Sequence, residues 1–267
     1  MEGKKKMCDE MGEYVNYDDK VVIVTGASSG IGADAARYFA KFGAKLALVG
    51  RNEERLMAVA RDCEEFKNNT PVCFLLDLTK EGSCESVISK TVEVYGKINV
   101  LVNGAGVSGM SSVFDKSIEI FDDIMAINLR VPFHMTQLAV PYLLKTKGNI
   151  VNVAYSMTTR FRPGFLVYNM AKIALESFAK QAAPELMLEG VRINCVSPGI
   201  TRTNILSGMN VEHSSYSWLF DNVESHLPCG KVLEPSEVAA YICLVASDIF
   251  PHMNGTRLVI DGAASLV

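Results

Sequence analysis

The chain of 267 residues is 49% hydrophobic, so it can bury the core of one large α/β domain or of two small ones. Its net charge of −4 argues against nucleic acid as a partner, because phosphate binding needs a basic surface. No apolar run approaches the roughly 18 residues of a membrane span, and no apolar region follows the basic N-terminus, so we expect neither a span nor a secretory signal.

Short apolar runs alternate from residue 20 almost to the end with helical patterns of about 12 to 30 residues. The predicted strands are residues 20–25, 45–50, 72–76, 98–103, 149–154, 192–197 and 257–262. Their nearly continuous apolar character is typical of a parallel sheet that is covered on both faces. The pattern predicts a single doubly wound α/β Rossmann domain over residues 20–267, with a seven-stranded parallel sheet and helices on both faces. Residues 1–19 lack the pattern and are predicted to form a flexible tail.

The first predicted strand runs into "TGASSGIG", residues 25–32, and then into a helical pattern. Gly26 allows a tight turn, and Gly30 and Gly32 let the backbone and the helix approach closely. The N-terminus of the helix then offers unpaired N–H groups to a pyrophosphate. The spacing is G-x-x-x-G-x-G and no lysine follows it, so the motif is not a nucleoside-triphosphate loop.

Asn128 lies in a helical pattern that Pro132 interrupts. Because proline has no N–H, the carbonyl of Asn128 loses its helical donor and could hold a water molecule. That water could bridge to Lys172 as a proton relay. The alternative is a simple proline kink.

Tyr168 and Lys172 are four residues apart in a helical pattern, so both side chains lie on one face of the helix. We expect the ammonium to lower the pKa of the phenol from about 10, which would make Tyr168 a general acid or base. Without the glycine turn, such a pair would more often serve packing and solubility.

Residues 201–234 follow the sixth predicted strand and break the rhythm of strands and helices. Ligands of open α/β sheets bind outside the carboxyl ends of the strands, so we expect a lid over the substrate here, or else an ordinary surface loop. Large apolar residues favour an apolar pocket, as for a steroid, an isoprenoid or an aromatic ketone, unless they pack against the sheet. They are residues 161–167, Met209, Tyr216, Trp218 and Leu219.

The seven cysteines and four histidines are scattered, with no C-x-x-C and no zinc-like spacing. We therefore predict no metal site, and reduced thiols in a cytoplasmic protein. Cys195 and Cys243 lie in apolar runs and are predicted to be core residues.

Taken in order, "TGASSGIG", "NGAG" at 103–106, Asn128, Tyr168-x-x-x-Lys172 and "PGITRT" at 198–203 resemble the classical short-chain dehydrogenase/reductase family. The resemblance spans residues 20–263. It implies a nicotinamide cofactor, and hydride transfer to or from a carbonyl or alcohol carbon of a small molecule. It also implies a homodimer or homotetramer.

The resemblance and the glycine turn together assign the cofactor contacts. In particular, Asp77 would accept from the adenine amino group, the amide of Ile200 would contact the carboxamide, and Thr203 would contact the pyrophosphate. Gly104 stands where the family often has an asparagine that braces the sheet. The assigned residues are Gly26, Ser28, Ser29, Gly30, Ile31, Arg51, Asp77, Leu78, Asn103, Gly104, Ala105, Tyr168, Lys172, Pro198, Gly199, Ile200 and Thr203.

The second predicted strand ends at Gly50, and Arg51 follows. An NAD-specific site has a carboxylate here for the ribose 2′-OH, whereas a guanidinium can bind a 2′-phosphate through two hydrogen bonds. We therefore predict NADP(H) as the cofactor. The alternative is that Arg51 is a solvated residue at a helix start.

Tyr155 stands thirteen residues before Tyr168, where the family normally has a serine that binds the substrate oxygen. Its hydroxyl reaches farther than that of a serine and its ring would fill part of the pocket. Ser156 should point to the opposite face of the strand unless a bulge re-aims it.

Two functions follow from these residues. One is an NADP(H)-dependent carbonyl reductase or alcohol dehydrogenase acting on a small apolar substrate, with Asn128, Tyr155, Tyr168 and Lys172 at the reacting centre. The other is an NADP(H)-binding relative with weak or no catalysis, because Tyr155 replaces the serine. Asn128, Tyr168 and Lys172 match the family's pattern, and these three groups favour the enzyme.

Overall fold

A computed structural model describes residues 15–66, 70–159, 163–205 and 215–267. It contains a seven-stranded sheet in the order β3-β2-β1-β4-β5-β6-β7, and every neighbouring pair is parallel. The predicted Rossmann sheet is confirmed. The strands are β1 (Val21–Thr25), β2 (Lys45–Gly50), β3 (Val72–Leu75), β4 (Val100–Asn103), β5 (Asn149–Val153), β6 (Arg192–Pro198) and β7 (Arg257–Ile260).

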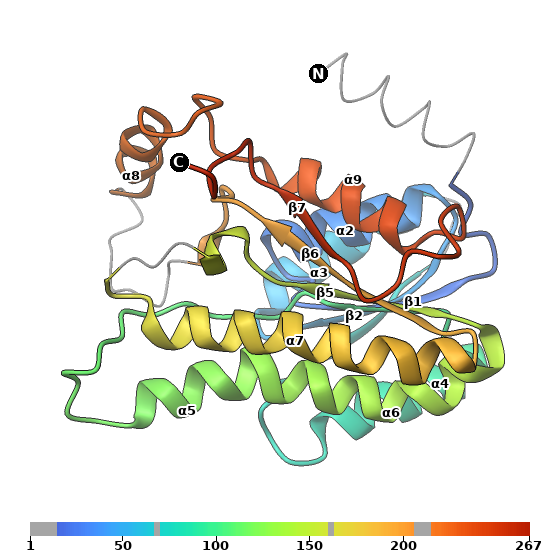
Figure 1. The fold of residues 1–267 in the computed structure, drawn as a ribbon. Helices are drawn as coiled ribbons and strands as arrows, with labels where there is room; N and C mark the ends of the chain where they lie inside the picture. The colour runs from blue at the N-terminus through green and yellow to red at the C-terminus, as the bar shows by residue number, and fades with distance from the viewer. Residues whose placement is uncertain (1–14, 67–69, 160–162, 206–214) are drawn as a thin grey trace.

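Helices cover both faces of the sheet (Figure 1). On one face lie α2 (Gly30–Lys41), α3 (Glu53–Glu64) and α9 (Pro235–Ala246). On the other lie α4 (Ser83–Tyr95), α5 (Glu119–Met125), α6 (Val131–Thr146) and α7 (Leu166–Leu188).

Each face of the sheet has its own hydrophobic core. In β1, Val22 and Val24 join the core under α2, whereas Ile23 joins the core under α6 and α7. Successive side chains of a strand point to opposite faces, so a strand buried on both sides must be apolar throughout. The strand order reverses between β1 and β4, and this is where such sheets open a crevice at the carboxyl ends of their strands.

The flexible tail predicted for residues 1–19 includes residues at its C-terminal end that are packed into the domain. Val15 and Tyr17 are each only 2% exposed. The Tyr17 hydroxyl donates to the carbonyl of Cys243 at 2.6 Å, and its ring meets Phe39 edge-on at 4.8 Å. Residues 15–19 therefore belong to the domain, because their partners on α9 and α2 bury them. Residues 1–14 lie outside the described part.

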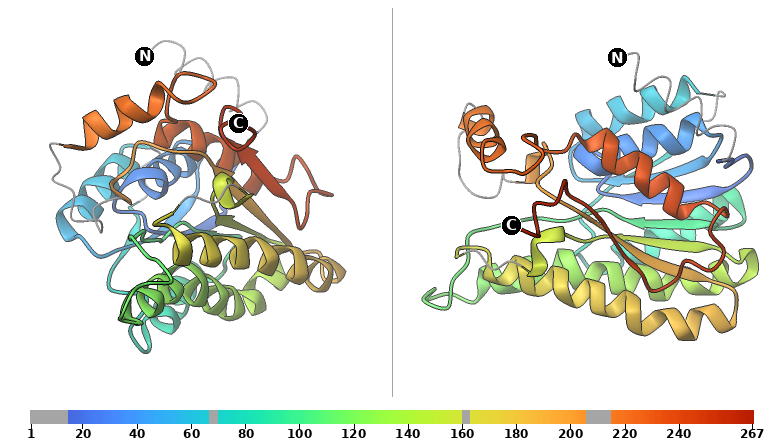
Figure 2. Two further views of the ribbon diagram at one scale, coloured as in Figure 1. Left: turned by 60° about the vertical axis from the view of Figure 1, so that its left-hand side comes forward. Right: turned by 45° about the horizontal axis from the view of Figure 1, so that its top comes forward.

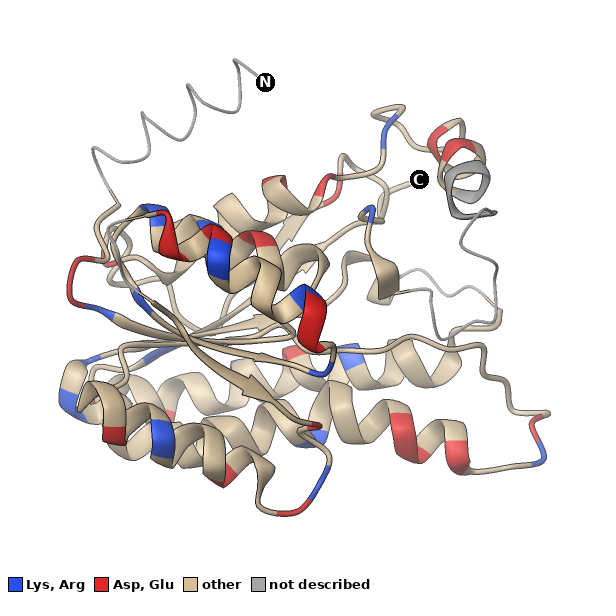
Figure 3. Ribbon diagram, turned by 180° about the vertical axis from the view of Figure 1, so that it is seen from behind, with Lys and Arg blue, Asp and Glu red and all other residues tan. Residues whose placement is uncertain are grey.

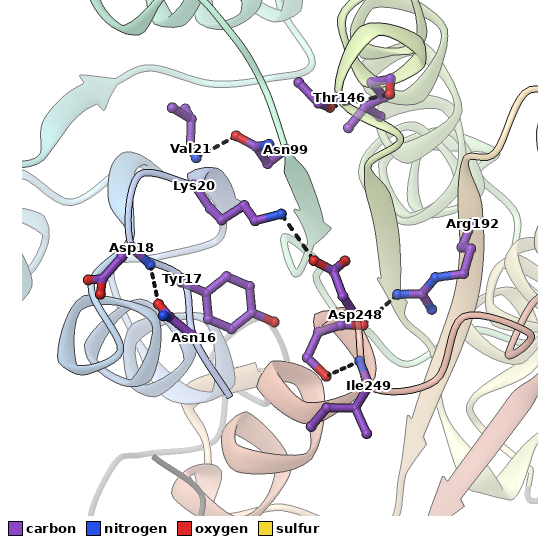
Figure 4. A network of polar contacts seen from close by, with 12 residues as sticks. Asn16, Tyr17, Asp18, Lys20, Val21, Asn99, Thr146, Arg192, Asp248 and Ile249 are labelled. Atoms are coloured by element: carbon purple, nitrogen blue, oxygen red, sulfur yellow. Dashed lines mark hydrogen bonds and ion pairs between the residues drawn. The ribbon is translucent and has the colours of Figure 1, made fainter. Parts of the chain in front are cut away.

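Polar contacts close the amino end of the sheet, opposite the crevice (Figure 4). The amide of Val21 donates to Asn99 Oδ1 at 2.9 Å, and Lys20 pairs with Asp248 at 3.0 Å. Arg192 donates from Nη2 to the carbonyl of Ser247 at 2.6 Å. These contacts join the starts of β1 and β6 to neighbouring loops.

Cys195 and Cys243 are buried, as predicted. Acidic and basic residues are interspersed along the helices in Figure 3, in keeping with the small net charge. No helix in the described ranges is long and apolar enough to cross a membrane.

Candidate active site

A cleft of about 790 Å³ opens at the carboxyl ends of the strands. Most of the predicted site residues line it. These are Gly26, Ser28, Ser29, Gly30, Ile31, Arg51, Asp77, Leu78, Gly104, Ala105, Tyr155, Tyr168, Lys172, Pro198, Gly199, Ile200 and Thr203. Asn103 and Asn128 lie outside this lining.

The glycine turn forms one end of the cleft. Gly26 has a φ of +74°, and a Cβ there would lie 2.8 Å from the carbonyl oxygen of Gly104. A Cβ on Gly30 would lie 2.9 Å from Thr203 Cγ2. Helix α2 starts at Gly30, and the Ser29 side chain does not cap it, so its first N–H groups remain available to an anion. This cradle, which side chains would fill, fits the pyrophosphate of a dinucleotide.

Tyr168 and Lys172 lie at the other end of the cleft, on the first turns of α7. Both are buried, at 7% and 4% exposure. Lys172 Nζ donates to the carbonyl of Val153 at 2.8 Å and lies 5.6 Å from the centroid of the Tyr168 ring. The helix thus brings phenol and ammonium together as the spacing predicts.

The pKa values of this pair differ from the sequence prediction. Burial raises the pKa of Tyr168, and the neighbouring Tyr155 raises it further. Burial also lowers the pKa of Lys172 to about 8. The expected lowering of the Tyr168 pKa is therefore wrong for these side chains. The reason is that burial disfavours the charged forms of both partners.

Asn128 lies in a π-helical turn, Ala126–Arg130, that joins α5 to α6 just before Pro132. Such widened turns recur at functional sites. Its Nδ2 donates to the carbonyls of Val107, at 2.8 Å, and Ile124, at 2.9 Å. Its buried Oδ1 has no hydrogen-bond partner among the described residues.

Gly106 separates Asn128 from Lys172. A Cβ on Gly106 would lie 2.7 Å from Asn128 Oδ1 and 3.5 Å from Lys172 Nζ. The absence of a side chain leaves Asn128 Oδ1 and Lys172 Nζ facing a common space. The relay expected from the sequence runs through the main-chain carbonyl of Asn128 instead, and it stays a prediction. The sequence analysis missed Gly106, although it is the last glycine of "NGAG".

Comparison with known proteins agrees with this geometry. The family described as enoyl-(acyl carrier protein) reductase matches residues 26–264. The chain belongs to the classical short-chain dehydrogenase/reductase family. It is 32% identical over 251 residues to meso-2,3-butanediol dehydrogenase of Serratia marcescens, covering 94% of this chain and 96% of that one. It is 30% identical over 249 residues to 3-oxoacyl-[acyl-carrier-protein] reductase of Thermotoga maritima, covering 93% and 98%.

A crystal structure from Caenorhabditis elegans has the same fold. It is a short-chain dehydrogenase/reductase solved with cofactor, with a TM-score of 0.89 and 31% identity, covering 94% of this chain and 97% of that one. Members of this family use a nicotinamide cofactor, so the cleft is the site that would bind it.

The cleft also extends past the carboxyl end of β2. A Cβ on Gly50 would lie 2.8 Å from Ser28 Cβ, so Ser28 closes over this strand end. Arg51 and Arg55 line the cleft here. The Asn52 side chain caps α3 by accepting from the amide of Arg55 at 2.9 Å. Two guanidinium groups and a helix start thus give this end a positive character.

Asp77 lies two residues beyond the end of β3 and lines the cleft. Its Oδ1 accepts from the amide of Thr79 at 2.9 Å and from the Thr79 hydroxyl at 2.8 Å. Burial raises the pKa of Asp77, but these bonds and the charge of Arg51 outweigh burial and leave the pKa below its ordinary value. Asp77 is therefore charged at neutral pH and one of its oxygens is engaged.

Asn103 braces the sheet. Its Nδ2 donates to Asn152 Oδ1 at 2.8 Å and so joins β4 to β5. The hydroxyl oxygen of Thr25 accepts from the amides of Gly104, at 3.0 Å, and Ala105, at 3.1 Å. Asn103 and Thr25 thus provide bracing beside the position where Gly104 replaces an asparagine. This arrangement favours a bracing role for the Asn103 side chain over a direct contact with the cofactor.

Tyr155, in the position of the family's serine, follows β5 and precedes the 3-10 turn η2 (Ser156–Thr159). Its ring meets the Tyr168 ring edge-on, with centroids 5.6 Å apart and planes at 63°. Ser156 is fully buried and lies outside the cleft lining. Strand β5 ends at Val153, so strand alternation does not decide where residues 155 and 156 point; the turn after the strand places Tyr155 in the cleft lining and leaves Ser156 out of it.

An ion pair between the buried Glu176 and the partly buried Arg257 supports the η2 turn from behind. Arg257 on β7 donates from Nε to Glu176 Oε1 at 2.9 Å, and from Nη2 to the carbonyl of Ser156 at 2.5 Å. Glu176, on α7, also accepts from the Ser197 hydroxyl at 2.9 Å. Sequence reasoning missed this pair, because 81 residues separate its members.

Arg257→Met should destabilise the fold by about 3–5 kcal/mol, because it leaves Glu176 as a buried charge without its cation. Arg257→Met combined with Glu176→Leu should be less destabilising than Arg257→Met alone, since no lone charge remains. Urea unfolding of the wild type and both variants measures these differences. Equal stability of wild type and Arg257→Met would contradict a structural role for the pair.

The predicted lid segment is described in part. It contains α8 (Ser215–Glu224), which lies at the crevice end of the molecule (Figure 2). Phe220 and Val223 line the cleft, and Arg202 pairs with Glu224 at 3.0 Å. Residues 206–214, with Met209, lie outside the described part, as do residues 161–162 and the side chains of Tyr216, Trp218 and Leu219. A lid role stays a prediction.

Proposed function

We propose that this protein is an NADP(H)-dependent oxidoreductase that acts on the carbonyl or secondary alcohol carbon of a small apolar substrate. The observation that carries the proposal is the cleft itself. One end is a glycine cradle at a helix start, and the other end holds Tyr168 and Lys172 side by side. A nicotinamide dinucleotide bound along this cleft would supply or accept a hydride.

The residues at the reacting end divide the remaining work. Tyr168 gives a proton to a carbonyl oxygen, or takes one from an alcohol. The protonated phenol is the form that gives a proton in carbonyl reduction. Lys172, fixed by the carbonyl of Val153, places a charge beside the phenol, and the space at Gly106 links it to Asn128.

The wall around Tyr168 supports an apolar substrate. Val107, Met110, Met157, Phe165 and Ile205 line this part of the cleft. Two relatives carry a substrate in their names, a vicinal diol in one and a 3-oxoacyl chain in the other. Each of these substrates has a second oxygen on a carbon one or two positions from the reacting carbon. Hydroxyketones and diketones therefore belong in the first assays beside simple ketones.

The competing function is an NADP(H)-binding protein with weak or no catalysis. The Tyr155 ring in the serine position, packed on Tyr168, favours it. Oxidation of NADPH with a panel of ketones and diketones separates the two functions. Consumption that depends on a ketone supports the enzyme, and tight NADPH binding without consumption supports the alternative.

Arg51→Ala should weaken NADPH binding by about 10- to 150-fold, equivalent to roughly 1.5–3 kcal/mol for a charge-assisted contact with the 2′-phosphate. NADH has no such phosphate, so its dissociation constant should change little. Titration of wild type and variant with both cofactors measures the effect. Tighter binding of NADH than of NADPH by the wild type would overturn the cofactor assignment.

We also propose self-association as a homodimer or homotetramer. Leu166, Met170 and Ile173 are 39–43% exposed at i, i+4 and i+7 on α7, and Phe133 on α6 is 44% exposed. An apolar stripe of this kind is typical of a helix face that another chain covers. Light scattering tests this, and a monomeric mass would contradict it.

A further inference from the structure

One face of α7, with the residue that precedes the helix, contributes four residues to the cleft. Phe165, Tyr168, Asn169 and Lys172 stand at i, i+3, i+4 and i+7, and all four line it. Side chains at these spacings lie together on one helix face. Asn169 is therefore a neighbour of the proposed proton donor and of its lysine on the wall of the cleft.

Asn169 is the polar exception in this part of the helix. Its side chain is 6% exposed, and its Oδ1 has no hydrogen-bond partner among the described residues. The surroundings of Tyr168 are otherwise mainly apolar, since it belongs to a hydrophobic cluster against which Val107, Tyr155 and Ile205 pack. A buried amide without a partner is destabilising unless a ligand or an ordered water molecule satisfies it.

Asn169 also differs from the other buried asparagines near the cleft. Asn103 and Asn152 bond each other across β4 and β5, and Asn128 binds two backbone carbonyls, so each is a structural brace through at least one atom. Among the described residues Asn169 Oδ1 has no such bond, although the residue lines the cleft.

We propose that Asn169 is a specificity-determining residue that hydrogen-bonds a second oxygen of the substrate, a hydroxyl or carbonyl close to the reacting carbon. This inference rests on the proposed function. An amide suits both kinds of oxygen, because its NH₂ donates to a carbonyl or hydroxyl and its oxygen accepts from a hydroxyl. The preferred substrate is then a hydroxyketone, diketone or diol with an apolar frame, rather than a simple ketone.

The test compares 2-hydroxycyclohexanone with cyclohexanone in wild type and Asn169→Leu. Leucine has nearly the same shape but no polar atoms, so the variant removes the hydrogen bonds without opening a cavity. The ratio of kcat/KM for the hydroxyketone to that for the ketone should fall about 3- to 12-fold, the equivalent of one hydrogen bond. Comparing ratios between proteins cancels the intrinsic reactivity of the two ketones. An unchanged ratio would overturn the proposal.

A binding measurement keeps this test separate from the test of the proposed function. Titration of the NADP⁺-loaded protein with cyclohexane-1,2-dione, a diketone that NADP⁺ cannot oxidise, proceeds without turnover, and Asn169→Leu should raise the dissociation constant by a similar factor. If the wild type reduces neither ketone, the proposed activity fails for these substrates, and the binding difference still decides the role of Asn169. Equal binding by both proteins would overturn it.

Stability provides a control for folding. Because Asn169→Leu removes a buried amide whose Oδ1 has no partner among the described residues, the urea midpoint of the variant should equal or exceed that of the wild type. A lower midpoint would indicate a structural bond to Asn169 and would contradict the proposal.

Discussion

Tyr168→Phe is expected to lower turnover of a ketone with NADPH by about 10²- to 10⁴-fold, the usual size of a general acid–base contribution. The substitution removes only the hydroxyl, and the ring can keep its edge-on contact with Tyr155. Binding of NADPH should therefore stay nearly intact. Steady-state rates and NADPH titrations of the same two proteins measure both effects.

A matched control is Tyr142→Phe, which removes a phenol hydroxyl from α6, outside the cleft lining. It should retain the wild-type rate. If Tyr168→Phe also kept most of its activity, another residue would carry the proton, and the reacting end of the cleft would have to be assigned again.

Tyr155→Ser is expected to raise turnover of ordinary ketones by about 10²- to 10³-fold, because it restores a short hydroxyl donor of the oxyanion-binding kind. It also removes the Tyr155 ring, whose centroid lies 5.6 Å from the centroid of the Tyr168 ring and which crowds the reacting end of the cleft. The pKa of Tyr168 should fall at the same time, since Tyr155 is one of the two causes that raise it. Steady-state rates of the wild type and the variant with one ketone and NADPH measure the gain.

Two further variants separate blocking from an altered role for Tyr155. Tyr155→Phe keeps the ring and should stay slow if the ring blocks the substrate, but it should lose activity if the Tyr155 hydroxyl binds the substrate oxygen. Ser156→Ala should change little, because Ser156 is buried outside the cleft. A large loss in Ser156→Ala would show that the serine function survives there.

The fold could be predicted because its strands are buried on both faces and so are nearly continuous apolar runs. The N-terminal boundary could not, since Val15 and Tyr17 are too few to form a pattern, and their burial depends on α9, more than 200 residues away. A sequence shows local periodicity, whereas a contact of this kind depends on the finished fold.

The site could be predicted residue by residue only where spacing fixes geometry. Tyr168 and Lys172 meet because four residues make about one helical turn. The pKa of Tyr168 is raised mainly because the side chain is buried, and the spacing of residues in a sequence does not reveal burial. The unpartnered amide of Asn169 and the space at Gly106 are properties of packing, so they emerged only from the structure.

The most direct test of the proposed activity is the transfer of a label. NADPH carrying deuterium at both C4 positions of the nicotinamide is incubated with 2-hydroxycyclohexanone and the protein, and the product is analysed by mass spectrometry. We predict one deuterium on the new carbinol carbon with the wild type, and a strongly reduced yield with Tyr168→Phe. Unlabelled carbinol, or labelled carbinol formed equally well by Tyr168→Phe, would contradict the proposed chemistry.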